Sequence, residues 1–350
     1  MVLNVSNDTS EVAPTDHPHN VIAIAPLAGP NDFLSDFAQA LGTDRPVVDY
    51  DKNFDALRRA KLVIFHWPNE FFARIGRRDA IVHLAHILRA KMRGTRFIWV
   101  AHNLRPHDSL APTPLLTTLF LRAIDGIIYL SDHSRDLVQA AYPAARSKRS
   151  LVTVHGRYAA NLPTTDFERP AADAPVRLCA FGQVRPYKNW DSLIGTALTT
   201  RRGSIGLHVI GQCNDPAYGE ALTSMAKSAG HIALDFSDDF LPIEALEAAI
   251  DAAHAAVLPY RQILNSGSAL QALSRNRPVL VPKIGSMPEL QNQVGGEWVY
   301  LYEGDLTADV LERFATAVRD DVRAPRPDLS AFEWERIGVQ LRAFAAELTN

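Results

Sequence analysis

The chain has 350 residues, of which 47% are hydrophobic and 21% are charged. At about 150 residues per domain this length predicts two domains, and the composition is that of a folded protein with large cores. The 36 Lys and Arg residues against 39 Asp and Glu residues give a net charge of -3, which argues against a general nucleic-acid binder. The two cysteines, Cys179 and Cys213, have no partner at metal-ligand spacing, which argues against a disulfide framework and a structural zinc site.

The start of the chain is polar. Residues 1–19 hold three acidic residues among Ser, Thr, Pro and His, without the basic start and apolar core of a secretory signal. We therefore expect a disordered lead-in there. No apolar run reaches the roughly 18 residues that a bilayer-spanning helix needs, so the sequence predicts a cytoplasmic protein.

Short apolar runs alternate with helical patterns along the chain. Such continuous apolar runs are typical of strands that are buried on both faces in parallel sheets. In chain order the predicted strands are 21–25, 62–66, 97–102, 127–130, 177–182, 207–211, 232–236, 255–259 and 278–282. Because the strand–helix alternation occurs twice, the pattern predicts an α/β protein with two facing Rossmann-like domains.

Three prolines and few apolar residues mark 161–175 as a linker between these domains. The N-terminal domain would span 20–160 and the C-terminal domain 176–330, and the last stretch, 331–350, has helical spacing and an apolar stripe. Ligands of open α/β folds bind beyond the carboxyl ends of the strands. We therefore expect functional residues in the loops that follow the strands, in the cleft between the domains.

The loop after the predicted strand 177–182 carries two cations. Arg185 and Lys188 follow Gly182 within six residues. A guanidinium offers a planar fork of donors and an ammonium a compact charge, and together they suit a diphosphate. The alternative interpretation is a solvated basic loop.

Residues 265–268, with the sequence Asn-Ser-Gly-Ser, directly precede a helical pattern. A helix start offers free backbone N–H groups and the positive end of the helix dipole, and Gly267 would let the backbone approach an anion closely. An N-cap, which needs only Asn or Ser, is the simpler interpretation. Further along, Glu289 could accept hydrogen bonds from ribose hydroxyls, or could act as a first-turn carboxylate that the helix dipole favours.

The N-terminal half offers three candidates for acid or base chemistry. His102 ends a predicted strand, Asp108 follows it, and Asp32 lies in the loop after the first strand. An imidazole or a carboxylate at a strand end can exchange a proton with a substrate, although a lone histidine is more often structural. Residues 131–134, Ser-Asp-His-Ser, have chiefly the composition of a helix start.

Residues 71–96 form a basic, amphipathic stretch with seven Lys or Arg residues, one acid and interleaved apolar residues. Such a surface can lie on anionic lipid headgroups. An ordinary core-packed helix with a solvated basic face explains the pattern equally well.

In their order and spacing, residues 182–188, 265–278, 285–289 and the final helix at Trp334 resemble the GT-B glycosyltransferases that use nucleotide sugars to build bacterial exopolysaccharides. Residues 102–108, His-Asn-Leu-Arg-Pro-His-Asp, together with 181–188 and 265–268, are most similar to β-mannosyltransferase-like members. The resemblance extends over nearly the whole chain.

The resemblance implies that the C-terminal domain holds a nucleoside-diphosphate sugar, that the N-terminal domain presents the acceptor, and that the last helix crosses back to the N-terminal domain. Lys188 matches the family's donor-phosphate lysine, with Arg185 as its companion. The predicted donor contacts are Gly182, Arg185, Lys188, Tyr260, Asn265, Ser266, Gly267, Ser268 and Glu289. The predicted acceptor contacts are Asn31, Asn103, Arg105 and His107.

The chain departs from the resembling families at one point. Large retaining families of this fold carry two Glu residues eight positions apart around the donor, and the matching positions here are Ile263 and Gln271. The resemblance therefore favours an inverting enzyme, which needs a base to deprotonate the acceptor hydroxyl. Asp108, His102 and Asp32 are the candidates for that base.

We therefore expect a glycosyltransferase that transfers a sugar from a nucleoside-diphosphate sugar, with GDP-mannose as a candidate, to a carbohydrate or polyprenyl-linked acceptor. Cationic side chains and a helix start would neutralise the diphosphate without a metal or another cofactor. The alternatives are a nucleotide-sugar epimerase of the same fold and a carbohydrate-binding protein without catalysis. The basic stretch 71–96 would give peripheral contact with an anionic membrane.

Overall fold

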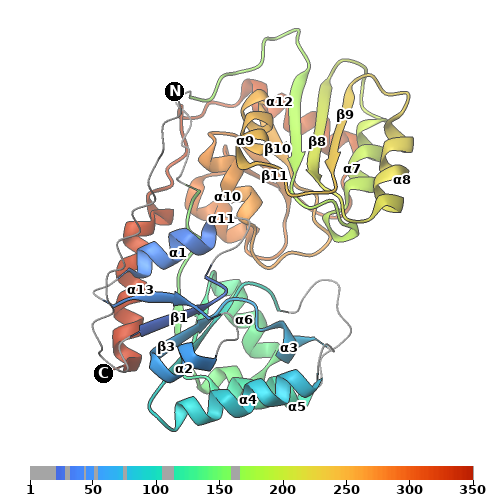
Figure 1. Cartoon of the computed structure of the whole chain (residues 1–350). Coiled ribbons are helices and arrows are strands. Elements are labelled where there is room, and N and C mark those ends of the chain that lie inside the picture. Colours follow the sequence, from blue (N-terminus) through green and yellow to red (C-terminus); the bar gives the residue numbers. More distant parts are fainter. Residues whose placement is uncertain are drawn as a thin grey trace, which may run out of the picture.

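The computed structural model describes residues 21–27, 32–42, 45–50, 54–73, 77–104, 114–158 and 166–349. The predicted lead-in, 1–19, and part of the predicted linker, 161–165, lie outside the described residues. The described chain forms two six-stranded parallel sheets, one after the other along the sequence. The prediction of an α/β protein with two Rossmann-like units is therefore confirmed (Figure 1).

The first sheet has the strand order β2-β1-β3-β4-β5-β6. Its strands are β1 (Val21–Ala25), β2 (Val47–Asp49), β3 (Ala60–Phe65), β4 (Arg96–Ala101), β5 (Gly126–Tyr129) and β6 (Arg149–Val152). Its helices are α1 (Phe33–Leu41), α2 (Phe54–Arg59), α3 (Asn69–Phe72), α4 (Arg77–Lys91), α5 (Pro114–Ala123), α6 (Asp132–Ala141) and the 3-10 helix η1 (Pro143–Ser147).

The second sheet has the strand order β12-β11-β10-β7-β8-β9. Its strands are β7 (Val176–Phe181), β8 (Ile205–Gln212), β9 (Ile232–Ser237), β10 (Ala255–Val257), β11 (Val279–Pro282) and β12 (Val299–Tyr302). The helices that follow are η2 (Pro186–Lys188), α7 (Trp190–Ala197), α8 (Pro216–Ala226), α9 (Ile243–Ala252), α10 (Gly267–Ser274), α11 (Met287–Val294), α12 (Ala308–Asp320), η3 (Ser330–Phe332) and α13 (Trp334–Thr349).

All nine predicted strands are present, within one or two residues at most ends. Three strands were not predicted: β2, β6 and β12. Each has only three or four residues, and β2 and β6 have no fully buried position. The strands β2 and β6 therefore lack the continuous apolar run on which the other predictions depended. The strand β12 does contain such a run, Val-Tyr-Leu-Tyr, which the prediction missed.

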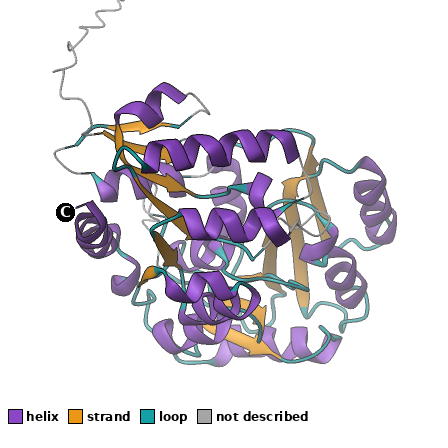
Figure 2. Ribbon diagram, turned by 90° about the horizontal axis from the view of Figure 1, so that it is seen from below, coloured by secondary structure: helices purple, strands orange, loops and turns teal. Residues whose placement is uncertain are grey.

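Both faces of the first sheet are covered by buried apolar side chains, which point alternately to one face and the other along each strand. In β3, Val63 and Phe65 pack against the core beneath α4 and α5, whereas Leu62 and Ile64 pack on the opposite side with α1 and α13. Successive side chains of a strand point to opposite faces, so a strand between two helical layers must be apolar throughout. The first sheet therefore lies between two layers of helices (Figures 1 and 2).

The C-terminal helix α13 returns from the second unit to the first, as expected. Ile337, Leu341 and Phe344 are buried in the same core as Ile22 and Ile24 of β1. In Figure 1 the red α13 lies beside the blue α1 and β1. Among the described helices, none combines the length and hydrophobicity required to span a membrane.

Gly338 allows α13 to approach α1 closely. A Cβ atom at this position would lie 2.5 Å from the backbone carbonyl oxygen of Ala40. That oxygen belongs to the backbone of helix α1 and cannot turn away as a flexible side chain could. The contact therefore requires a glycine.

We expect Gly338→Ala to lower the free energy of unfolding by about 1–3 kcal/mol, the range typical of overpacking. The matched control is Gly195→Ala in α7, where the nearest atom to the added Cβ, Met225 Cε, is at an ordinary 3.7 Å. Because alanine is the better helix former, the control should be neutral or slightly stabilising. Urea unfolding monitored by circular dichroism measures both, and equal effects would contradict the packing explanation.

Candidate functional site

A cavity of about 340 Å³ lies between the two units. Asp32 and Tyr158 line it from the first unit, and the loops after β7 and β8 and the start of α10 line it from the second. The residues of the second unit that line it are Gly182, Gln183, Tyr187, Lys188, Gly211, Gln212, Phe240, Leu241, Ile243, Leu246, Ser268 and Gln271. The cavity thus lies at the carboxyl ends of the strands, where the sequence predicted a ligand site.

Lys188 and Ser268 converge in this cavity over Gly182. A Cβ atom at Gly182 would lie 3.6 Å from Lys188 Nζ and 3.7 Å from Ser268 Oγ, and Gly182 itself has φ of 111°. The Lys188 side chain is buried, and its ammonium lies 4.7 Å from the centre of the Tyr260 ring. An ammonium, a hydroxyl and a position without a side chain therefore surround one small space, as an anion site requires.

Arg185, the predicted companion of Lys188, does not line this cavity. It is half-buried at the residue that precedes η2. Of the two cations predicted to meet a diphosphate, only Lys188 therefore faces the cavity.

The predicted helix start at residues 265–268 divides into two roles. Ser266 is the N-cap of α10: its Oγ accepts a hydrogen bond from the backbone N–H of Ala269 at 3.0 Å and lies 2.9 Å from the Tyr260 hydroxyl. The simpler interpretation, an N-cap, therefore describes Ser266, whereas Ser268 lines the cavity. A Cβ at Gly267 would lie 2.7 Å from Tyr158 Oη, so this glycine permits close contact with the first unit.

Asn265 and Glu289 bind the first unit instead of facing Lys188. The Glu289 carboxylate accepts hydrogen bonds from the backbone N–H groups of Asp132 and His133, at 3.0 and 2.6 Å. The Asn265 Oδ1 atom accepts from the hydroxyls of Ser131 and Ser134, at 3.1 and 3.0 Å. We call these contacts the interdomain clasp.

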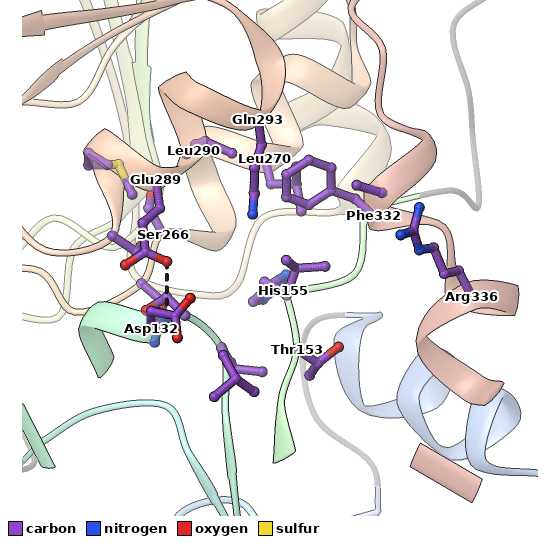
Figure 3. Close-up of a pocket in the computed structure, with 18 of the residues that line it drawn as sticks. Asp132, Thr153, His155, Ser266, Leu270, Glu289, Leu290, Gln293, Phe332 and Arg336 are labelled. Carbon is purple, nitrogen blue, oxygen red and sulfur yellow. Dashed lines mark hydrogen bonds between the residues drawn. The ribbon is translucent and has the colours of Figure 1, made fainter. Parts of the chain in front are cut away.

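The clasp satisfies the N-terminus of α6, because a carboxylate there meets free N–H groups and the positive end of the helix dipole. Ser131 is the N-cap of α6, as its composition predicted. Beside the clasp lies a second cavity of about 260 Å³, to which Asp132, His155, Glu289 and Arg336 contribute (Figure 3). In this structure Asn265 and Glu289 make contacts that join the two units, and both also line this second cavity.

The candidate base His102 lies in a buried pair of imidazoles. His66 Nδ1 and His102 Nε2 are 2.9 Å apart, and the His102 ring stacks on Trp67. Burial lowers the pKa of His66 to about 3, and burial together with the neighbouring imidazoles holds the pKa of His102 well below its usual value. An imidazole with so low a pKa is a weak proton acceptor at neutral pH.

The remaining candidates of the first unit differ in position. Asp32 lines the cavity that holds Lys188, and its side chain does not cap α1. Asn103 is half-buried just beyond β4 and lines neither of these two cavities. Asn31, Arg105, His107 and Asp108 lie outside the described residues.

Tyr158 is a cavity residue that sequence reasoning missed. Burial, and then the negative charge of Asp32, raise its pKa above the usual value, so its hydroxyl keeps its proton. Tyr158 follows β6, a strand that was not predicted. A strand prediction at 149–152 would have drawn attention to the segment that follows it, because ligands bind beyond the carboxyl ends of the strands.

Comparisons with known proteins agree with this architecture. No family model matches the chain. The sequence is 28% identical over 317 residues to a GDP-mannose:glycolipid 4-beta-D-mannosyltransferase of Xanthomonas campestris pv. campestris, a match that covers 89% of this chain and 87% of that protein.

Solved structures share the fold. HepE of Anabaena, in complex with UDP, matches with a TM-score of 0.62 at 14% identity, covering 94% of this chain and 98% of that one. Sucrose-phosphate synthase of Thermosynechococcus elongatus matches with a TM-score of 0.60 at 13% identity and covers 95% of each chain. The fold is therefore GT-B, as the resemblance implied.

The buried imidazoles predict an acid-sensitive fold. Burial also lowers the pKa of His155 to about 4, so His66, His102 and His155 are neutral in the native state but take up protons near pH 6.5 when unfolded. The unfolded state then binds more protons, and stability should fall as the pH drops from 6.5 to 4 by up to about 1.4 kcal/mol per pH unit for each group.

His66→Asn removes one of these groups and should flatten the dependence of the free energy of unfolding on pH in this window. His86→Asn, a half-buried position on α4 outside the cluster, is the control and should leave the slope unchanged. Urea titrations at half-unit pH steps measure the slope. An unchanged slope in His66→Asn would show that this imidazole does not carry the effect.

Proposed function

We propose that this chain, a nucleotide-sugar glycosyltransferase of the GT-B fold, transfers a mannosyl residue from GDP-mannose to a lipid-linked glycan acceptor in bacterial polysaccharide synthesis, with inversion and without a metal. The observation that supports this function most directly is the convergence of Lys188 Nζ and Ser268 Oγ over Gly182, in a cavity that Asp32 faces from the other unit. The donor and the acceptor class follow from similarity to the Xanthomonas enzyme, whose name gives GDP-mannose and a glycolipid.

The second unit has the features of a donor site. The Lys188 ammonium and the Ser268 hydroxyl would hold the diphosphate at the start of α10, where the helix dipole favours negative charge. Leu241, Ile243 and Leu246 give one wall of the cavity an apolar surface against which a base or a sugar ring can pack. In the transition state these cationic and polar groups would stabilise the charge of the departing diphosphate.

Asp32 is our candidate for the catalytic base. Its carboxylate would take the proton of the acceptor hydroxyl as the oxygen bonds to the anomeric carbon. The bond from that carbon to the diphosphate oxygen breaks on the opposite face, and the diphosphate leaves with the electron pair. Three observations support Asp32 over His102: it lines the cavity, it does not cap its own helix, and His102 is held neutral in the core.

Two residues, Gln271 and Ile263, support an inverting mechanism. Gln271 is buried and lines the cavity, at the position where retaining relatives carry an acid. An amide can hydrogen-bond a sugar or ribose hydroxyl but cannot accept a proton as a carboxylate does. The second position, Ile263, is a half-buried apolar residue. An acidic pair therefore does not flank the donor at these positions.

A lipid-linked acceptor requires the enzyme to work beside a membrane. We propose that the protein is cytoplasmic and peripheral on the inner face of the membrane. The basic stretch 71–96 supports this location, because the N-terminal unit that carries it would also present the acceptor.

Lys188→Ala should weaken GDP binding by about 10- to 100-fold, because it removes a charge-assisted hydrogen bond from a buried site. Lys227→Ala, an exposed lysine of the same unit, should leave the affinity unchanged. Isothermal titration with GDP and UDP measures both variants. If Lys188→Ala bound GDP as tightly as wild type, the proposed diphosphate site would be wrong.

Asp32→Asn should lower kcat by about 10²- to 10⁴-fold while the affinity for GDP-mannose stays within about twofold, since a general base acts on the acceptor. Asp36→Asn, one turn further along α1, does not line the cavity and is the matched control. NMR of the product reports the anomeric configuration. A full rate in Asp32→Asn, or a product with the configuration of the donor, would contradict the mechanism.

The same assays separate the alternative functions. Conversion of the donor sugar without an acceptor would identify an epimerase. Tight donor binding without turnover on a lipid-linked mannosyl acceptor would identify a carbohydrate-binding protein.

A further inference from the structure

The helices α4 and α5 form an exposed face on the first unit, on the side of the sheet opposite α1 and α13. They pack side by side, and Figure 1 shows them along the edge of the molecule farthest from the second sheet. Figure 2 looks onto this end of the molecule. We call it the α4–α5 face.

The apolar side chains of α4 fall into two separate stripes. Ala80, Leu84, Ile87 and Ala90 are buried against the core of the sheet. A second stripe, Ile81, Ala85, Leu88 and Met92, has spacings of three and four residues and faces solvent: Ile81 is 58% exposed, Leu88 47% and Met92, just beyond the helix, 82%. Residues three and four apart share one side of a helix, so these side chains form a continuous apolar ridge.

Arginines flank this ridge. Arg78, Arg89 and Arg93 are exposed at spacings that put them on the neighbouring side of the helix, together with Val82, which is 44% exposed. None of the ion pairs among the described residues includes these arginines. Lys91 and Arg96, by contrast, both bind Asp125.

Helix α5 repeats the pattern beside α4. Leu115 is 65% exposed and Leu119 37%, and Arg122 is exposed one turn further on. Of the twelve large hydrophobic residues that are exposed in the described part of the chain, six lie on this face. Monomeric proteins rarely gather exposed apolar side chains in one place unless the place binds something.

The ordinary alternative for this stretch is a core-packed helix with a solvated basic face. It explains the buried stripe and the arginines. It does not explain Ile81, Leu88 and Met92, which neither join the core nor interact well with water. A surface that offers apolar side chains between long cations suits a bilayer, where the apolar groups enter the acyl boundary and the guanidinium groups reach the headgroups.

The positive charge of this face favours a bilayer with anionic lipids. Residues 77–96 carry six basic residues and one acid, in a chain whose net charge is -3. The excess positive charge is therefore local and complements anionic phospholipids. It does not reflect the general balance of the protein.

We propose that the α4–α5 face docks on the surface of an anionic phospholipid bilayer. Helices between parallel strands run antiparallel to them, so α4 and α5 both begin at the edge of the sheet where the cleft lies. The proposal deepens the proposed function, because docking through this face would keep the enzyme at the membrane where a lipid-linked acceptor lies.

The test uses vesicle sedimentation of the whole protein without donor or acceptor. Wild type should bind vesicles containing phosphatidylglycerol and remain in solution with phosphatidylcholine alone. Leu88→Glu with Met92→Glu should weaken binding at least about tenfold, because two apolar contacts are replaced by charges that the lipid repels. The matched control, Val322→Glu with Val339→Glu, alters two valines that are 86% and 61% exposed on other surfaces and should bind as wild type does.

A charge arm tests the lipid class. Arg89→Glu with Arg93→Glu should weaken binding to the anionic vesicles at least about thirtyfold, since each cation at an anionic leaflet contributes about fivefold. Arg202→Glu, an exposed arginine of the second unit, should have little effect. Circular dichroism verifies that every variant is folded.

Two results would overturn the proposal: wild type that stays in solution with anionic vesicles, or face variants that bind as tightly as wild type. A shift from dimer to monomer in Leu88→Glu with Met92→Glu on a sizing column would instead identify the face as a contact between copies of the chain. Because neither sugar nor nucleotide enters the assay, its failure would leave the transferase assignment intact. An unchanged rate in the Asp32 variant, or unchanged GDP binding in the Lys188 variant, would in turn leave the membrane result standing.

Discussion

The site depends on the burial of one positive charge, the ammonium of Lys188. A cation removed from water loses hydration free energy, and among the described residues no carboxylate pairs with this one. The face of the Tyr260 ring offsets part of the loss, and the Ser268 hydroxyl borders the same space above Gly182. The cavity is therefore biased toward an anion before any ligand arrives. Such preorganisation is what charge stabilisation of a departing diphosphate requires.

The sequence was sufficient to predict the two sheets because a strand between two helical layers must be apolar at every position. Strands such as β3, with five of six residues buried, can be recognised from the residues alone. The short β2 and β6 contain no such run, and their exposure follows from their place at the two edges of the sheet. The position of a strand in the sheet determines how exposed it is, and the residues of a short strand do not reveal that position.

The site was predicted in part for a related reason. Lys188 and Ser268 follow buried strands, so their approach to the cleft follows from the fold class. Asn265 and Glu289 have the same local signature, yet their partners are the hydroxyls and N–H groups at the start of α6, more than 130 residues away in the sequence. A polar residue at a helix start predicts that an N–H group will be satisfied but does not say which helix supplies it.

The interdomain clasp also bears on how this architecture can be recombined. Its acceptors, Asn265 and Glu289, belong to the second unit, and the groups that donate to them belong to the first. A chimera that joins the first unit of one relative to the second unit of another would keep both folds. It would lose the contacts of the clasp unless residues 131–134 and the two acceptors were taken from the same relative. The two halves can therefore be exchanged between relatives only if both sides of the clasp come from the same protein.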